Sequence, residues 1–269
     1  MTDFFKNKVV AITGGSDGIG KALVNMLIAL DAKVATCGRN QDKLYDLQVT
    51  HSGKPLHTIV ADVSNDNDCK NFIDSTIKVF GGIDILINNA GISMRALLKD
   101  VDVEVIQKVM NINFTGTLYC TKLALDSITE RKGSIVGISS IAGYRGLPGR
   151  SGYSASKFAM RGFLEALRTE LLGSGVNVMW VCPGFTTSNI RNAALNKKGQ
   201  SQEESPMDEG KMMSSEACAR HILKAIEKRK RTLILTFNGK QTVFMNRFFP
   251  SLADKFVRKF FFKNGELVR

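Results

Sequence analysis

The chain has 269 residues, 43% of them hydrophobic and 23% charged, so it is long enough to bury one sizeable core. Its five cysteines are scattered and its three histidines are not spaced as metal ligands, which excludes a disulfide framework and a metal site and favours a reducing cytoplasm. The net charge is +12, and residues 228–269 carry +9 of it. The rest of the chain carries +3, an ordinary value that does not indicate nucleic-acid binding.

Short β-branched runs alternate with helix-length segments along the chain. The expected strands are 8–13, 33–37, 57–63, 83–88, 134–139, 176–182 and 232–236. Several of them are too continuously apolar for a sheet with one wet face, so helices should cover both faces. We therefore predict an α/β doubly wound Rossmann fold, with a seven-stranded parallel sheet and helices on both faces, as a single catalytic domain over residues 1–230.

The first expected strand ends in a glycine-rich turn, Gly14-Gly-Ser16-Asp17-Gly18-Ile19-Gly20, that opens a helix. Glycines at these positions let the backbone approach a pyrophosphate at the helix N-terminus, so a dinucleotide is expected here. At the end of the second strand, Arg39 can pair with a ribose 2′-phosphate, and no carboxylate follows that strand to bind a free 2′-hydroxyl. NADP(H) is therefore favoured over NAD(H).

Farther along, Tyr153 and Lys157 stand four residues apart, thirteen residues after Ser140. On a helix these two side chains share one face, and the Lys157 ammonium is expected to lower the pKa of the Tyr153 phenol toward neutrality. A phenol tuned in this way can exchange protons with a carbonyl or an alcohol. By itself a Tyr-x-x-x-Lys pair is a weak signal, because it arises by chance about once in every two chains of this length.

The ordered motifs together resemble those of the short-chain dehydrogenase/reductase family over residues 6–230, and look similar to the branch with 11-beta-hydroxysteroid dehydrogenase and 3-ketodihydrosphinganine reductase. The resemblance implies that Tyr153 protonates the carbonyl oxygen, that Ser140 hydrogen-bonds this oxygen, that Lys157 holds the nicotinamide ribose, and that Asn113 anchors a proton-relaying water. It also implies further contacts to the cofactor, with Asp62 at the adenine. The remaining implied cofactor-binding residues are Val63, Asn89, Ala90, Gly91, Pro183, Gly184, Thr186 and Ser188.

Two segments lie outside this pattern of strands and helices. Residues 186–213 are polar and loop-like after a strand end, the place where substrate lids occur in such folds. Residues 231–269 contain the last strand and a basic, Phe-rich extension, with half of the sixteen phenylalanines after residue 236. Ser251 to Asp254 is typical of a capping box, and the apolar residues that follow would form one stripe of an amphipathic helix. That stripe could contact an anionic membrane, the protein's own core or a second subunit.

These features indicate an oxidoreductase that interconverts a secondary alcohol and a ketone, with a small-molecule substrate that is lipophilic. The alternative is a non-catalytic NADP(H)-binding sensor or scaffold. The chain starts directly with its first strand and has no apolar run near the ~18 residues of a membrane span, so we expect a cytoplasmic protein with, at most, peripheral membrane contact. The resemblance further implies a homodimer or homotetramer built through the helices after 151 and at 111–131.

Overall fold

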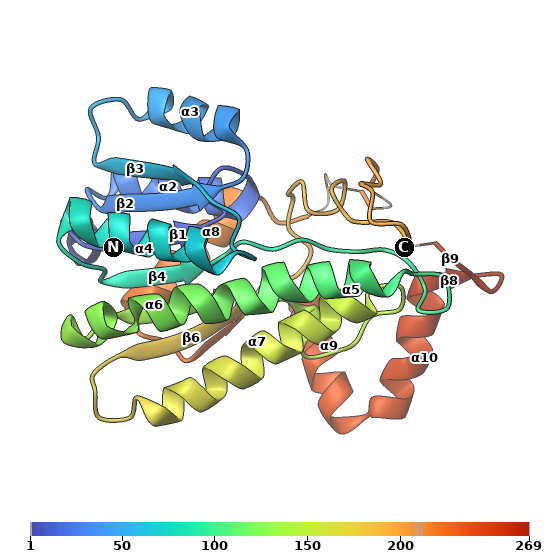
Figure 1. The fold of residues 1–269 in the computed structure, drawn as a ribbon. Helices are drawn as coiled ribbons and strands as arrows, with labels where there is room; N and C mark the ends of the chain where they lie inside the picture. The colour runs from blue at the N-terminus through green and yellow to red at the C-terminus, as the bar shows by residue number, and fades with distance from the viewer. Residues whose placement is uncertain (1, 206, 209, 211, 269) are drawn as a thin grey trace.

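The computed structural model describes residues 2–205, 207, 208, 210 and 212–268 (Figure 1). One parallel sheet has the strand order β3-β2-β1-β4-β5-β6-β7. Its strands are β1 Val9–Thr13, β2 Lys33–Gly38, β3 Leu56–Val60, β4 Ile85–Asn88, β5 Ser134–Ile138, β6 Asn177–Cys182 and β7 Thr232–Ile234. The predicted seven-stranded doubly wound fold is confirmed. The strand order reverses between β1 and β4, and the carboxyl ends of these strands are where ligands bind in such sheets.

Helices cover both faces of this sheet, as the apolar strands require (Figure 1). One core lies under α2, α3 and α8, and the other under α4, α6 and α7. The bounds are α1 Thr2–Phe5, α2 Gly18–Ala29, α3 Gln41–Thr50, α4 Asp66–Phe80, α5 Val103–Met110, α6 Gly116–Glu130, α7 Ser151–Glu170 and α8 Ser215–Glu227. β1, β4 and β5 are buried along their whole length, and each large apolar side chain so buried contributes about 1.5–3 kcal/mol.

Helix α4 illustrates how the sequence sets these elements. Its buried positions Cys69, Phe72, Ile73 and Thr76 follow the spacing of one helix face. The Asn65 side chain precedes the helix and accepts a hydrogen bond from the Asp68 amide at 3.1 Å. Gly81 ends the helix with a φ of 81°, which glycine adopts without strain. All five cysteines of the chain are buried free thiols.

The C-terminal extension folds as a helical hairpin, α9 Phe237–Phe248 and α10 Pro250–Phe261, followed by the two-stranded β8 Phe262–Lys263 and β9 Glu266–Leu267 (Figure 1). The predicted capping box at Ser251 is wrong. Helix α10 begins earlier, at Pro250, which suits the first helical turn because it has no amide hydrogen to satisfy. Asp254 instead forms an ion pair with Arg145.

The predicted apolar stripe of α10 divides into two rows. Ala253 and Phe261 are buried against the protein, whereas Leu252, Phe256 and Phe260 are exposed by 45%, 55% and 37%. The hairpin is attached to the loop after β5, since the Asn246 side chain donates to the Tyr144 carbonyl at 2.9 Å. One part of the stripe therefore packs on the protein's own core and another faces outward. No helix among the described residues is long and apolar enough to cross a bilayer.

Candidate functional site

A glycine-rich turn joins β1 to α2 at the carboxyl edge of the sheet. Gly14 and Gly18 have φ angles of 70° and 50°, which favour glycine. A Cβ atom on Gly20 would lie 2.1 Å from the Gly14 carbonyl oxygen, so a side chain cannot be added there without moving the backbone. Asp17 caps α2 by accepting a hydrogen bond from the Gly18 amide at 2.7 Å. The turn thus combines glycines that leave the backbone accessible with the N-terminus of α2. This cradle, residues 14–20, fits a pyrophosphate.

Thr13, which the sequence analysis did not single out, connects this turn to the end of β4. Its hydroxyl accepts hydrogen bonds from the amides of Asn89 and Ala90, both at 3.0 Å. The Asn89 side chain donates in return to the carbonyls of Thr13 and Gly14, also at 3.0 Å. The predicted segment Asn89–Gly91 is therefore held against the glycine turn. A hydroxyl as the last residue of an otherwise apolar strand was the signal for this role.

Asn113 lies in a π-helical turn, Asn111–Thr115, between α5 and α6, and its side chain is fully buried. Its Oδ1 accepts from the Ile92 amide at 2.8 Å, and its Nδ2 donates to the Ile92 carbonyl and the Ser156 hydroxyl at 2.9 Å each. Ser156 donates in turn to the Tyr153 carbonyl at 2.8 Å. Asn113 thus fixes α7 relative to the segment after β4, and π-helical turns are frequent at functional sites. Its water-anchoring role stays a prediction.

The other three predicted catalytic residues meet at the end of β5. The Ser140 hydroxyl accepts from the Ala142 amide at 3.1 Å, and the same side chain favours the ionised form of the Tyr153 phenol by lowering its pKa. Lys157, one turn along α7, donates to the Ile138 carbonyl at 2.8 Å. Its Nζ atom lies 5.8 Å from the centre of the Tyr153 ring. A hydroxyl pair and an ammonium therefore converge beside Gly91, where an added Cβ would lie 3.3 Å from the Lys157 Nζ.

The pKa values correct one expectation. Burial raises the pKa of the Tyr153 phenol, and the Ser140 hydrogen bond and the Arg150 charge only oppose this effect. Burial also lowers the pKa of Lys157 to about 8. Because burial disfavours the phenolate more than Ser140 and Arg150 favour it, the predicted net lowering of the Tyr153 pKa is wrong for this structure. The sequence analysis missed Arg150, since this residue belongs to none of the motifs.

Two cations flank the site expected for a ribose 2′-phosphate. Arg39 is exposed, with its Nη1 3.9 Å from an Asp62 carboxylate oxygen. Lys43, in the first turn of α3, forms an ion pair with Asp17. The sequence analysis missed Lys43, although its position four residues after Arg39 was a usable signal. Asp17 therefore has a cationic partner, and a second positive side chain joins Arg39 at this end of the cradle.

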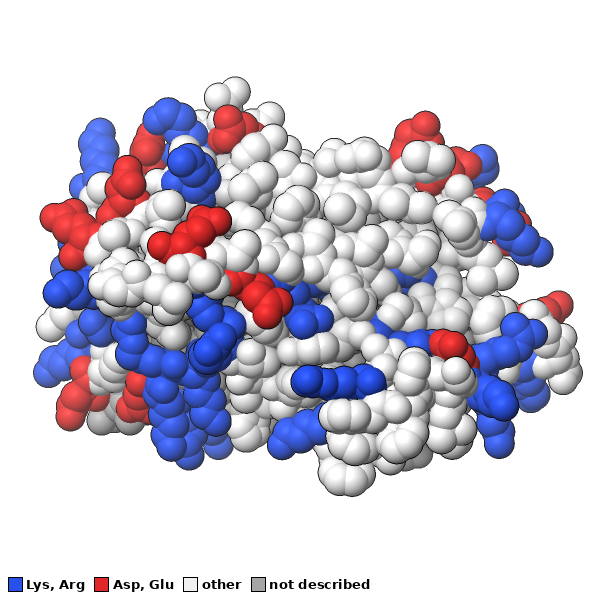
Figure 2. Space-filling model, turned by 90° about the horizontal axis from the view of Figure 1, so that it is seen from below, with Lys and Arg blue, Asp and Glu red and all other residues white. Residues whose placement is uncertain are grey.

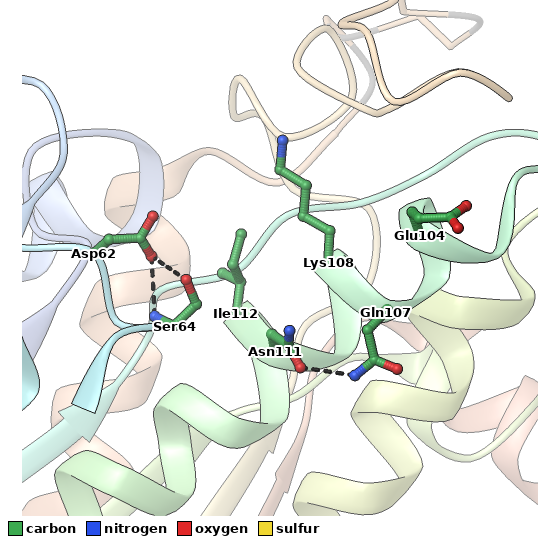
Figure 3. A pocket seen from close by; sticks show the side chains of 7 residues that line it. All are labelled: Asp62, Ser64, Glu104, Gln107, Lys108, Asn111 and Ile112. Atoms are coloured by element: carbon green, nitrogen blue, oxygen red, sulfur yellow. Dashed lines mark hydrogen bonds between the residues drawn. The ribbon is translucent and has the colours of Figure 1, made fainter.

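A cleft of about 250 Å³ lies next to Asp62 (Figure 3). Asp62 and Ser64 form one wall, where the Asp62 carboxylate accepts from the Ser64 amide and hydroxyl at 2.9 and 2.7 Å. Ile112 and Lys108 come from the opposite wall, formed by α5 and the π-helical turn. Val63 is buried beneath, where a Cβ on Gly116 would approach it to 2.8 Å. The residue predicted to contact the adenine, Asp62, thus lies at an open cleft.

The segment after β6 closes the other side of the cradle. A Cβ on Gly184 would lie 2.3 Å from the Thr236 hydroxyl, so the backbone after Pro183 packs tightly against the segment that follows β7. Thr186 is buried and donates to the Gly184 carbonyl at 3.2 Å. A Cβ on Gly18 would come within 3.1 Å of Ser188. Of the four predicted residues of this segment, Ser188 thus lies against the glycine turn.

The predicted lid continues from this segment. Residue 195 pairs with the segment after β4, because the Leu195 amide donates to the Ser93 carbonyl at 2.9 Å and its carbonyl accepts from Arg95 at 2.8 Å. The Asp102 amide donates to the Lys197 carbonyl at 3.0 Å. This part of the lid therefore crosses residues 93–102. Residues 206, 209 and 211 of the lid, and residue 269 of the extension, lie outside the described residues.

The sequence of this chain is similar to those of known proteins. The family model described as short chain dehydrogenase matches residues 8–199. "Dehydrogenase/reductase SDR family member 7B" of Mus musculus is 33% identical over 257 residues, covering 93% of this chain and 80% of the relative. "Dehydrogenase/reductase SDR family protein 7-like" of Anopheles gambiae is 36% identical over 238 residues, covering 85% and 74%.

A solved structure shares the fold. It is a short chain dehydrogenase/reductase from Burkholderia phymatum in complex with NAD, with a TM-score of 0.81 and 22% identity. The match covers 92% of this chain and 95% of that chain, so the similarity extends through the whole sheet and its helices. At this identity the likeness concerns the fold alone.

Proposed function

Because the chain belongs to the short-chain dehydrogenase/reductase family, we propose that it interconverts a secondary alcohol and a ketone with NADP(H), using Tyr153 as the proton donor and acceptor. The observation that carries this proposal is the position of the buried Lys157 ammonium, 5.8 Å from the centre of the Tyr153 ring, at the end of β5 where Ser140 also acts on the phenol. The residues of the cradle fit a dinucleotide, which when bound supplies or takes up the hydride.

Each polar group has a distinct task in ketone reduction. The Ser140 and Tyr153 hydroxyls both donate to the carbonyl oxygen, and the Tyr153 proton passes to this oxygen as negative charge develops on it. Lys157, with a pKa of about 8, is mostly protonated at neutral pH and stabilises the tyrosinate that remains. Asn113 holds α7, and with it Tyr153 and Lys157, in register with the segment after β4. Tyr153 then regains a proton from solvent.

Arg39 and Lys43 support the preference for NADP(H). A guanidinium can bind a phosphate with two hydrogen bonds, and an ammonium nearby adds attraction for the same charge. Both cations are at the end of the cradle where the adenosine ribose is expected, and both contact carboxylates only in part-exposed pairs. A 2′-phosphate would replace weak surface pairs with stronger ones.

A lipophilic substrate is supported by the apolar side chains around Tyr153. The residue packs beside a cluster that includes Met94, Val109 and Leu195. Phe185, just after β6, stacks on Phe260 of α10 with ring centres 6.2 Å apart. The exposed rings of Phe185 and Phe260 thus offer apolar surface to a substrate chain.

We propose peripheral attachment to the cytoplasmic face of a membrane through the surface of the α9–α10 hairpin. Its exposed apolar side chains are Phe237, Phe244, Phe248, Phe249, Leu252, Phe256 and Phe260. Figure 2, seen from the side of the hairpin, shows uncharged side chains with Lys and Arg around them. Lys240, Arg247 and Lys255 are exposed on the same two helices, an arrangement that suits the headgroup region of an anionic bilayer. Five buried reduced thiols support the cytoplasmic side.

Vesicle flotation tests this attachment. Phe248→Ser/Phe249→Ser changes two exposed rings at the tip of the hairpin, and Val60→Ser/Val79→Ser is the matched control at exposed positions of β3 and α4. The first variant should lose flotation with phosphatidylserine-containing vesicles, and the second should float like the wild type. Equal flotation of both variants would end the membrane proposal. If the hairpin variant instead changes the oligomeric state, the surface belongs to a second copy.

We also propose a homodimer or homotetramer that forms through α6 and α7. Phe158 on α7 supports this contact, because its ring is 44% exposed in the middle of a long helix. Light scattering of the wild type and of Phe158→Glu measures the assembly. A monomeric wild type would contradict the proposal.

The reaction is tested by mixing purified protein with NADPH and a panel of long-chain and steroid ketones, and following the nicotinamide absorbance. Turnover of lipophilic ketones well above that of small polar ketones is expected. Tight NADPH binding without turnover of any ketone or oxidation of any alcohol would favour the sensor or scaffold alternative.

A further inference from the structure

Arg150 stands immediately before α7, three residues ahead of Tyr153. Its Nη1 atom is buried and has no hydrogen-bond partner among the described residues. The guanidinium carbon lies 5.2 Å from the centre of the Phe261 ring, so α10 covers one face of the group. This contact covers a flat face of the guanidinium, whereas Nη1, which carries N–H donors on the edge of the group, has no acceptor among the residues that the structure describes.

A buried cationic donor without an acceptor costs free energy, typically more than a neutral one. Other cations increase this cost here. Burial, followed by the charges of Arg95 and Arg191, lowers the pKa of Arg150 to about 10. Arg95 has its own carboxylate partner, Glu204, at 3.0 Å. A protein that keeps Arg150 in this place gains a strong binding group for an anion.

The group is also close to the reacting atoms. Arg150 precedes the first turn of α7, in which Tyr153 stands, and its positive charge opposes the rise of the Tyr153 pKa. The Gly149 carbonyl accepts from the Ala96 amide at 2.9 Å, so this turn lies beside the segment after β4. Arg150 therefore lies near Tyr153, with Phe261 of the hairpin on one side and the charges of Arg95 and Arg191 acting on it.

We propose that Arg150 binds an oxyanion of the substrate, a carboxylate or a phosphate, a few bonds from the carbonyl that Tyr153 protonates. This inference rests on the proposed function and narrows its substrate class to an amphiphile. The anionic end contacts Arg150, and the apolar part follows Phe261 and the Phe185–Phe260 stack toward the hairpin. A planar guanidinium suits both oxyanions because it offers two parallel N–H donors.

Ligand binding tests the subsite without knowledge of the natural substrate. Calorimetry compares octanoate with octanol, below their aggregation concentrations, on full-length protein saturated with NADP⁺ so that the 2′-phosphate site is filled. Octanoate should bind the wild type about 10–100-fold more tightly than it binds Arg150→Gln, and Arg150→Lys should recover part of the difference. Octanol should bind all three alike. Arg220→Gln, an exposed arginine on α8, is the matched control and should behave as the wild type.

Equal octanoate affinity in the wild type and Arg150→Gln would overturn the inference. An equal loss of octanoate and octanol would also overturn it, because Arg150 would then act only by supporting α10. Octyl phosphate in the same titration separates the two oxyanions, and the tighter of the two identifies the group that the subsite prefers.

Steady-state kinetics test the Arg150 subsite separately from the proposed ketone reduction. A long-chain keto acid and its methyl ester differ in one charge, and Arg150→Gln should raise KM for the acid about 10–100-fold with little effect on kcat or on the ester. Ester turnover without any preference for the acid would contradict the subsite and leave the proposed reaction standing. Octanoate binding that depends on Arg150, without turnover of either ketone, would support the subsite and contradict the reaction.

Discussion

The Lys157 ammonium lies 5.8 Å from the centre of the Tyr153 ring and donates its hydrogen bond to the Ile138 carbonyl at 2.8 Å. Lys157 is only 3% exposed, and burial lowers its pKa to about 8. Ketone reduction should therefore fall as the pH rises through about 8, because neutral Lys157 no longer stabilises the tyrosinate. A kcat profile from about pH 6 to about 9.5 measures this fall on both sides of the Lys157 pKa. A profile that stays flat across that range would contradict the role of Lys157.

The same group makes stability depend on pH. The folded pKa of Lys157, about 8, is below the ordinary value of 10.5, so the unfolded chain binds more protons between these values. The Lys157 contribution to the free energy of unfolding should therefore rise with pH from 8 to 10.5, by about 1.4 kcal/mol per pH unit. Urea unfolding of the wild type and Lys157→Met tests this. Parallel pH profiles for the two proteins would show that Lys157 does not titrate in this window.

Arg39 and Lys43 should select the cofactor. Arg39→Ala should weaken NADPH binding about 10–100-fold, as loss of a charge-assisted pair predicts, and Lys43→Ala should weaken it less. NADH binding should change little in either variant. Nucleotide fluorescence titrations with both cofactors measure these affinities. If Arg39→Ala weakens NADPH and NADH equally, Arg39 does not read the 2′-phosphate.

Gly20→Ala should abolish nucleotide binding or destabilise the chain by about 1–3 kcal/mol, because the new methyl group would lie 2.1 Å from the Gly14 carbonyl oxygen. Gly162→Ala is the matched control. It lies within α7 with no atom within 4 Å of the added Cβ, so it should stabilise the protein by about 0.5–1 kcal/mol. Thermal melts with and without NADPH compare them, and an unchanged NADPH shift in Gly20→Ala would argue against a cofactor at this turn.

Ser140→Ala should lower kcat about 100-fold while NADPH affinity stays the same, since it removes one of two donors to the carbonyl oxygen. Ser139→Ala is an informative neighbour, because that hydroxyl donates to the Lys157 carbonyl and not to Tyr153. It should affect activity far less. A larger loss of kcat in Ser139→Ala than in Ser140→Ala would reverse the assignment of the two serines.

The sheet and the position of the cradle could be predicted from the sequence because their signals are local. Apolar strand runs and a glycine-rich turn after a strand are patterns within a few residues, and in the structure Gly14 and Gly18 have positive φ angles that favour glycine. Lys43 could also have been found, since its distance from Arg39 along the chain is short. Each of these inferences needs only neighbouring residues.

The remaining features depend on long-range packing. Arg150 and Phe261 are far apart in the sequence, and only the folded hairpin brings the ring onto the guanidinium. In the same hairpin, part of the apolar stripe of α10 packs on the protein's own core and part lies at the surface. Helix periodicity predicts the stripe but not which of its residues are buried. The direction of the Tyr153 pKa shift likewise depends on burial by several segments, so a spacing rule based on Lys157 alone gave the wrong sign.

Tyr153→Phe tests the central claim most directly. The substitution removes the phenolic proton and leaves the ring packing beside Lys157 in place. NADPH affinity should be unchanged, and ketone reduction should fall by a factor of at least about 100, as loss of a general acid requires. Turnover within a few-fold of the wild type, with cofactor still bound, would contradict Tyr153 as the proton donor.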